Sequence, residues 1–425
     1  MKPFSNRWFV LIAGIIVNIC IGTGYAWSVY QVGLFNESVW IFGHQLTEAQ
    51  LALTFTICSA IAPICMIVGE PLQKLLGGPR AVVWLGGACF GGGLILSGVS
   101  KSIFGLYISY GLVTGFGLSL TYGIIIDNAV KFFPDKRGFV AGVTTAAFGV
   151  GSIIFPPIIE RIMSRLGVQS AFVILGVIFA VLIIGFGTFV NPPPERIVCG
   201  GGAVDDKSSS PPQDFSNNSH EALIDRSRKQ MLLDFRFWLM FAAFTIFATG
   251  GLMVITQGAQ IIKAFGVFDQ ALAAAVVSII AVGNTLGRIV WGLCSDKLGR
   301  YNTLIIMAGC VGLLGFCGFL CVKLSLLVPF IVCAVLIAAC YGGSMGVYPA
   351  LTADVFGQRH NGVNYGIMFT GFAVGGFIGP AFANRLNYSD ALLVVGVLGI
   401  IAVLIICVLK TKRNAANLYS DFTFF

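Results

Sequence analysis

Arg288 and Asn284 stand one helical turn apart inside an apolar stretch of the chain. The segment 281–300 reads AVGNTLGRIVWGLCSDKLGR. A lone arginine at the centre of a helix in a bilayer costs roughly 2.5–3.5 kcal/mol on insertion scales, so it needs a partner. Its guanidinium is a planar fork of donors that matches a carboxylate. Two interpretations are open: Arg288 binds an anionic ligand, or it pairs with an acid of another helix or extends toward the membrane surface.

Asn284 lies on the same helical face as Arg288, since the two are four residues apart. Its amide could contact the same ligand or hold the guanidinium in place. It could also be an ordinary packing residue between helices. We keep Asn284 as a candidate binding residue.

Asp127 is the only acid that lies well inside an apolar run of the sequence. An ionisable group at that depth is a candidate for proton coupling. Lys131 follows four residues later on the same face of a helix, and an ion pair between the two explains Asp127 as well. We favour the ion pair and keep the proton site as the alternative.

Several charged residues lie where apolar runs end, and we expect four of them to form a gate at the cytoplasmic face. The four are Glu70, Asp296, Arg300 and Asp354. Charges at helix ends that face one another can hold two parts of a membrane protein together on one side. Further bases available as partners are Lys74, Arg137 and Arg359. The alternative interpretation is solvated surface charge.

The composition places these residues in a membrane protein. Hydrophobic residues make up 57% of the 425-residue chain and charged residues only 10%, against about 25% charged in soluble domains. Only helices satisfy every backbone group in such long apolar runs, so we predict an all-α integral membrane protein. The twelve predicted transmembrane helices are 8–30, 47–68, 81–99, 103–130, 138–162, 168–190, 234–258, 269–293, 302–322, 325–349, 361–384 and 389–410.

The chain divides into two halves that resemble each other. Residues 191–233 are rich in proline, glycine, serine and charge, which predicts a linker. We expect a six-helix half at 1–190, the linker at 191–233, a second six-helix half at 234–410 and a tail at 411–425. An offset of 224 residues aligns Gly138 with Gly362 and Gly142 with Gly366. Parallel repeats of this kind place a substrate site between the halves.

Basic residues predict the orientation in the membrane. With both termini inside, 19 of the 26 lysines and arginines fall in cytoplasmic segments and six outside, while Arg288 remains in the membrane. This asymmetry follows the positive-inside rule. The net charge of +8 is therefore explained by topology, and we expect no nucleic-acid partner. The partner surface is the lipid bilayer, and the plasma membrane is the expected location.

The chain resembles the major facilitator superfamily, and within it the oxalate/formate antiporter group, close to the monocarboxylate transporters. The loop motif GLCSDKLGR at 292–300 carries the wider resemblance, whereas its counterpart GEPLQKLLGGPR at 69–80 has Gln73 where an acid is usual. The narrower resemblance rests on NRWFV (6–10), GYAWSVY (24–30), TYGIIIDNAVKFFPDKRG (121–138), GRIVWGLCSDKLGRYNT (287–303) and NYGIMF (364–369).

This resemblance implies the residues of a pocket. In the family, the arginine of the eighth transmembrane helix, which corresponds to 269–293 here, binds substrate carboxylate. This resemblance favours the ligand interpretation of Arg288. Pocket aromatics of the family fall at Tyr25, Tyr30, Tyr122 and Tyr341. Their hydroxyls can donate to a carboxylate while the rings exclude water. The alternative for each of the four is ordinary packing.

Phe372 marks a departure from the oxalate exchangers, which the resemblance expects to carry a second basic residue at this place, six positions beyond Gly366. A buried dianion needs about two compensating charges, and this chain offers one. We therefore expect a transporter of small monocarboxylates such as formate, pyruvate or lactate, working by proton coupling or anion exchange. An exchanger of oxalate or another dicarboxylate remains the alternative, and a membrane sensor with the same fold a remote one.

Motifs for other chemistry are missing from the sequence. It contains no G-x-x-x-x-G-K-[ST] nucleotide-binding motif and no C-x-x-C pair. We expect neither a cofactor nor a metal, no enzymatic activity, and a monomer whose partners are the carboxylate substrate and, in the coupled case, protons.

The orientation is testable by cysteine labelling in whole cells. A cysteine at Phe215, in the predicted linker, should be shielded from membrane-impermeant reagents. A cysteine at Trp40, in the first predicted external segment, should react with them. The reverse pattern would show that the chain has the opposite orientation.

Overall fold

The structure is a computed structural model that describes residues 6–193, 225–265, 270–383 and 385–422. Its elements in chain order are α1 (Arg7–Ile21), the 3₁₀ helix η1 (Gly22–Ala26), α2 (Trp27–Phe42), α3 (Glu48–Ala60), α4 (Ala62–Leu75), α5 (Pro79–Val99), α6 (Ile103–Leu106), the π-helix η2 (Tyr107–Thr114), α7 (Gly115–Phe132), α8 (Arg137–Gly187), α10 (Arg228–Leu233), α11 (Phe235–Ala264), α12 (Gln270–Leu298), α13 (Arg300–Lys323), α14 (Leu327–Phe356), α15 (Asn361–Ala383) and α16 (Tyr388–Phe422).

The helices supply the membrane passes that the sequence predicts. Eleven helical segments among the described residues are long and apolar enough to cross a bilayer. One of them, α8, is 51 residues long and contains Gly167 with φ 80° and ψ 166°, so it is two helices joined at a bend. Counting α8 as two gives twelve passes, and the predicted all-helical membrane fold is confirmed.

The predicted linker and tail contain helices at their edges. Residues 194–224 of the linker lie outside the described residues, but α10 occupies 228–233. Helix α16 is 35 residues long and runs to Phe422, through most of the range predicted as a tail. A basic stretch at 410–413 follows the apolar run and does not end the helix.

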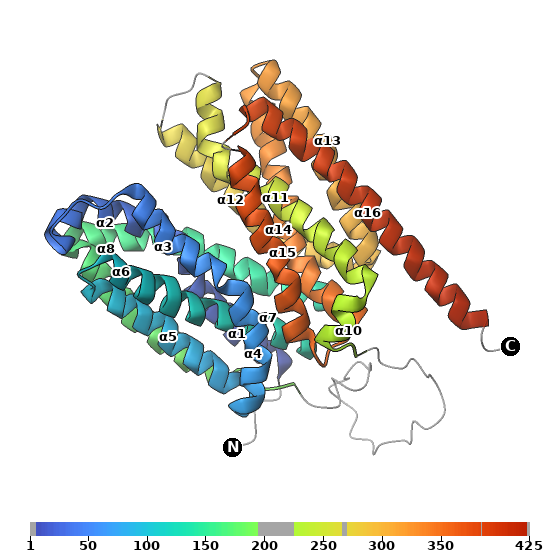
Figure 1. Cartoon of the computed structure of the whole chain (residues 1–425), viewed down its shortest axis with the longest axis horizontal. Helices are drawn as coiled ribbons and strands as arrows, with labels where there is room; N and C mark the ends of the chain where they lie inside the picture. Colours follow the sequence, from blue (N-terminus) through green and yellow to red (C-terminus); the bar gives the residue numbers. More distant parts are fainter. Residues whose placement is uncertain (1–5, 194–224, 266–269, 384, 423–425) are drawn as a thin grey trace.

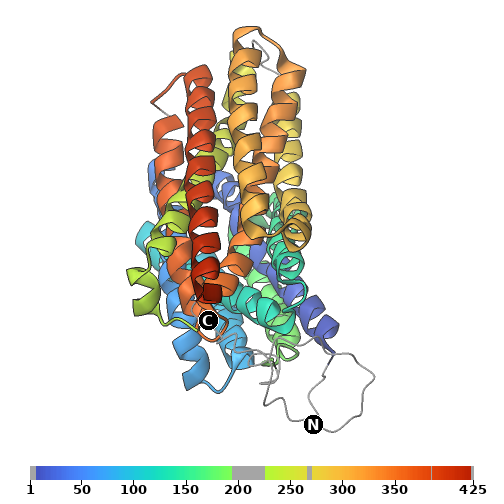
Figure 2. The same cartoon turned by 90° about the vertical axis from the view of Figure 1, so that its right-hand side faces the viewer.

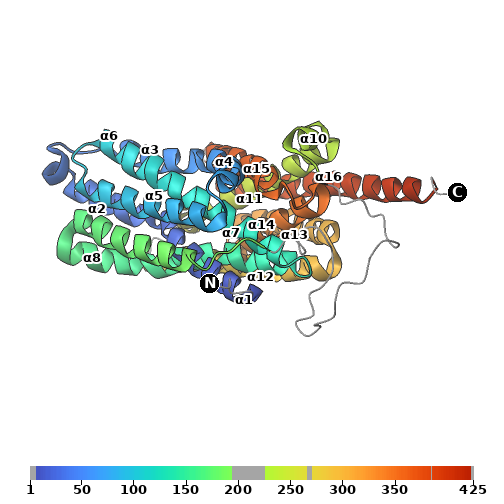
Figure 3. The ribbon, with the colours of Figure 1, turned by 90° about the horizontal axis from the view of Figure 1, so that it is seen from below.

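The helices form two bundles that meet at one end. Helices α1 to α8 make the N-terminal bundle and α10 to α16 the C-terminal bundle, and the two diverge away from their contact (Figure 1). The contacts between them join α8 to α12 and α14, α4 to α15, and α7 to α14 and α15. Within the bundles, α5 packs beside α8 (Figure 3), and α16 packs along α13 (Figure 2).

Glycines let the two bundles approach closely. A Cβ on Gly142 of α8 would lie 2.3 Å from the carbonyl oxygen of Arg288, and one on Gly366 of α15 would lie 2.8 Å from the backbone nitrogen of Ile67. Side chains at these positions would push the helices apart. Gly142 and Gly366 align in the sequence repeat, so equivalent glycines serve the same contact on the two sides of the molecule.

Candidate functional site

Arg288 lies on α12 at the contact between the two bundles, with only 4% of its surface exposed. Its Nη1 donates to the carbonyl oxygen of Thr145 on α8 at 2.7 Å, which crosses from one bundle to the other. Its Nη2 donates to Oδ1 of Asn284 at 3.1 Å. Neither acceptor is a carboxylate, and within the described ranges no acid lies at ion-pair distance from this guanidinium. The charge is therefore buried without a counter-charge from the described chain.

Asn284 fixes the guanidinium to a neighbouring helix. Its Nδ2 donates to the carbonyl oxygen of Ala338 on α14 at 3.1 Å, while its Oδ1 accepts from Arg288. This orients the amide, because each side of it has a defined partner. The four-residue spacing in the sequence therefore corresponds to a bonded pair.

Aromatic residues from both bundles surround this region. Tyr122 of α7 packs against Phe148 of α8, with ring centroids 5.2 Å apart, and faces Phe369 of α15 across the bundle contact at 6.2 Å. Tyr365 lies 5.9 Å from Phe369. Phe372 stacks on Phe369 at 4.8 Å. Together these rings form an apolar, two-sided wall beside one cation.

Tyr30 and Tyr341 are buried elsewhere in the described chain. Tyr30 stacks on Phe172 at 4.1 Å, inside the N-terminal bundle. Tyr341 is buried on α14, where a Cβ on Gly251 would lie 2.2 Å from its ring. The side chain of Tyr25 lies outside the described residues. The structure therefore brings Arg288, Asn284, Tyr122 and Phe372 into one region and leaves Tyr30 in a separate aromatic group.

Three residues near Arg288 were not predicted from the sequence: Tyr365, Phe369 and Phe148. The first two belong to NYGIMF, which the sequence analysis used for the family resemblance but not for the pocket. Their spacing of four residues places them on one face of α15. Phe148 carried no signal beyond being apolar.

Asp127 is bonded on both sides. Its carboxylate accepts from Nζ of Lys131 at 2.7 Å and from Nδ2 of Asn361 at 3.0 Å. The predicted i,i+4 ion pair is thus present, and Asn361 adds a bond to the opposite bundle. Both members of the ion pair are buried.

Asp296 of α12 caps a helix in the opposite bundle. Its two carboxylate oxygens accept from the backbone N–H groups of Gly138 at 2.8 Å and Phe139 at 2.7 Å, in the first turn of α8. These N–H groups have no partner within their own helix, and the positive end of the helix dipole favours an anion there. Arg300 holds the carboxylate in position at 2.6 Å.

Glu70 of α4 makes the reciprocal contact. Its Oε2 accepts from the backbone N–H of Val363 at 3.1 Å, in the first turn of α15. By the 223-residue offset that aligns Lys74 with Lys297, the counterpart of Asp296 is Gln73. The acid that the loop lacks at Gln73 is therefore supplied one turn earlier, by Glu70.

Asp354 completes the contact at this end of the molecule. It accepts from Nε of Arg300 at 2.9 Å and pairs with Arg137 of the N-terminal bundle. Lys74 pairs with Glu70 at 3.0 Å from a largely exposed position. All four predicted gate residues thus lie where the bundles meet. Asp296, Arg300 and Asp354 form one set of contacts, and Glu70 forms another with α15.

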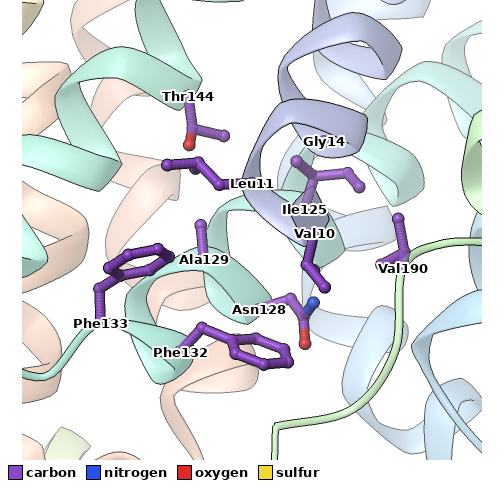
Figure 4. A pocket seen from close by; sticks show the side chains of 10 residues that line it. All are labelled: Val10, Leu11, Gly14, Ile125, Asn128, Ala129, Phe132, Phe133, Thr144 and Val190. Atoms are coloured by element: carbon purple, nitrogen blue, oxygen red, sulfur yellow. The ribbon is translucent and has the colours of Figure 1, made fainter. Parts of the chain in front are cut away.

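A small pocket in the N-terminal bundle is distinct from this region. It lies between α1 and α7, and its walls are mainly apolar, with Asn128 and Thr144 as polar exceptions (Figure 4). Its volume of about 10 Å³ holds roughly one water molecule. It is too small to accept a carboxylate substrate.

Two helical bundles that meet around a buried cation define the architecture of a secondary transporter. The sequence model described as Major Facilitator Superfamily matches residues 10–380 and 261–419, and the chain belongs to this superfamily. It is therefore a multi-pass membrane transporter and not an enzyme.

Among its relatives is the oxalate:formate antiporter of Oxalobacter formigenes, 29% identical over 407 residues that cover 94% of this chain and 90% of the relative. Monocarboxylate transporter 12 of Homo sapiens is 25% identical, covering 82% of this chain and 70% of the relative. The structure of the proton:xylose symporter XylE bound to 6-bromo-6-deoxy-D-glucose is similar in fold, with a TM-score of 0.66, 14% identity and coverage of 94% and 95%.

The reciprocal caps are testable by hydrogen exchange. Asp296→Ala should speed exchange of the Gly138 and Phe139 amides about fivefold, and Glu70→Ala should do the same at Val363, since a lost cap costs about 1 kcal/mol. Asp135→Ala is the matched control, because Asp135 pairs with Arg7 inside one bundle. Unchanged exchange in both gate variants would contradict the capping role.

Proposed function

We propose that this protein is a secondary active transporter of small monocarboxylates, such as formate, pyruvate or lactate, by alternating access. The observation that carries the proposal is Arg288: a guanidinium buried between two bundles with no described acid beside it. Such a charge is stabilised by an anion that binds reversibly. The names of the relatives, an oxalate:formate antiporter and a monocarboxylate transporter, support carboxylates as the substrate class.

Arg288 is the one positive charge beside the aromatic rings of the described region, which supports a substrate with a single carboxylate. Phe372 stacks on Phe369 and brings no charge to the region. One guanidinium balances one carboxylate, whereas a dianion would leave a buried negative charge without a partner. An oxalate or dicarboxylate exchanger is the second candidate, and the antiporter relative at 29% identity is the observation that favours it.

The bonds that cross between the bundles support alternating access. We assign the closed end to the cytoplasm and the protein to the plasma membrane, on the basis of the basic residues, so that the bundles diverge toward the outside. A substrate carboxylate would compete with the carbonyl of Thr145 for Arg288. Release of that bond loosens the contact between α8 and α12, after which the gate of Asp296, Arg300, Asp354 and Glu70 opens inward.

Two driving forces for substrate transport fit this site: exchange for another anion, or movement of a proton together with the substrate carboxylate. We assign Asp127 a structural role, because it is held by Lys131 and Asn361 at the bundle contact. The transporter would act as a monomer, since each chain carries both bundles and the site between them.

Arg288→Lys tests the site. Lysine keeps the charge but not the two-pronged geometry, so uptake of labelled pyruvate, lactate or formate into proteoliposomes should fall about tenfold or more while expression is preserved. Lys323→Arg, at an exposed helix end, is a control that should transport like wild type. If Arg288→Lys transports with wild-type affinity, Arg288 does not bind the substrate.

Phe372→Lys tests charge matching. Wild type should prefer lactate or pyruvate to oxalate in competition uptake, and the variant should shift that preference toward oxalate because it adds a second cation. Phe372→Met, which removes the ring without adding charge, is the control. Strong oxalate binding by wild type, or no gain of oxalate over lactate in Phe372→Lys, would favour the dicarboxylate alternative or pocket size as the determinant.

A further inference from the structure

Two buried donors in the region of Arg288 have no acceptor. The Nε of Arg288 and the hydroxyl of Tyr365 are both buried and without a hydrogen-bond partner among the residues that the structure describes. Tyr365 is 1% exposed and Arg288 is 4% exposed. Leaving a buried polar group unpaired costs about 1–3 kcal/mol, so both donors are expensive to keep.

The two donors belong to one environment. Tyr365 and Tyr122 both pack against Phe369 of α15. Tyr122 also packs against Phe148 of α8, one turn from Thr145, whose carbonyl oxygen accepts from Arg288. Phe369, 5.9 Å from Tyr365 and 6.2 Å from Tyr122, packs between the tyrosines. The two Nη atoms of Arg288 are engaged by Thr145 and Asn284. Each Nη keeps a second N–H, but the atoms of these two side chains with no hydrogen bond to the described residues are the Nε of Arg288 on α12 and the hydroxyl of Tyr365 on α15.

Other buried tyrosines show that this combination is unusual in the described chain. The hydroxyl of Tyr348 donates to the carbonyl oxygen of Met240 at 3.1 Å, and that of Tyr110 to Gly24 at 3.4 Å. Tyr30 also has an unpaired hydroxyl, but it stacks on Phe172 in the separate aromatic group. Tyr365 differs from these three residues because its unpaired hydroxyl belongs to the ring cluster that reaches the contact made by Arg288.

We propose that Tyr365 is a substrate ligand whose hydroxyl donates, together with the Nε of Arg288, to a single bound carboxylate. A carboxylate accepts several hydrogen bonds on its two oxygens, and bonds to a charged acceptor are about twice as strong as neutral ones. One anion thus satisfies both donors at once. This inference rests on the proposed function and extends it, because it assigns a second polar ligand to the substrate.

The proposal predicts opposite effects on stability and on binding. Removing an unpaired hydroxyl takes away no bond in the free protein, so Tyr365→Phe should keep or raise the melting temperature without ligand. Binding loses one charge-assisted hydrogen bond, so the dissociation constants for formate, pyruvate and lactate should rise about tenfold. Both are measured on purified full-length protein by thermal shift across titrations of each sodium salt.

Tyr348→Phe is the matched control. It removes a hydroxyl that has a partner, so the melting temperature without ligand should fall while the ligand titrations match wild type. Arg288→Lys, measured in parallel, reports whether the site itself is correct. Supporting results are weaker binding by Tyr365→Phe without loss of stability, and the reverse pattern in Tyr348→Phe.

The outcomes separate the inference from the proposed function. If wild type responds to the acids, Arg288→Lys does not, and Tyr365→Phe binds as tightly as wild type, then Tyr365 is not a ligand and the proposed function stands. A lower melting temperature of Tyr365→Phe without ligand would also overturn the inference, because the hydroxyl would then have a structural partner. No response of wild type to any of the acids would overturn the proposed function and the inference together.

Discussion

Reciprocal capping of helices across the two bundles is the interaction on which the arrangement of this protein depends. Asp296 of the C-terminal bundle accepts from the first turn of α8, and Glu70 of the N-terminal bundle accepts from the first turn of α15. Each carboxylate meets two needs: it satisfies backbone donors that no helix can satisfy itself, and it ties one bundle to the other. The glycines of α8 and α15 allow the backbones to come close enough for these bonds.

Arg288 and Asp296 both lie on α12, and both bond to α8 of the opposite bundle. Arg288 does so through the carbonyl oxygen of Thr145 and Asp296 through the backbone N–H of Gly138. Arg288 and Asp296 thus belong to one contact between α8 and α12. Under the proposed function, a ligand that engages the guanidinium would act directly on this contact between the bundles. The aromatic rings beside Arg288 lower the local dielectric constant, so the electrostatic interaction of its guanidinium with any acceptor is stronger there than in water.

The fold was predictable from the sequence because apolar runs and the distribution of basic residues are strong local signals. The position of Arg288 in a membrane helix was visible for the same reason, and its spacing from Asn284 indicated a shared face. Its acceptor on α8 was not predictable, because a backbone carbonyl leaves no mark in the residue types. Glu70 was expected as a gate residue, but its role in place of Gln73 depends on where α4 ends relative to α15. Tyr365 was overlooked because an unpaired hydroxyl is a property of packing, and Tyr30 fell in a separate aromatic group because nothing local distinguishes one buried tyrosine from another.

The paired caps also bear on how well the protein keeps ions from crossing unaccompanied. Glu70 and Asp296 hold opposite bundles from two sides, so a tilt that breaks one cap strains the other and gains no new bond. If the two caps open together, as the proposed alternating access requires, a half-open form is sparsely populated. A continuous water path from one face to the other would then be short-lived, and small ions would have little opportunity to cross without substrate.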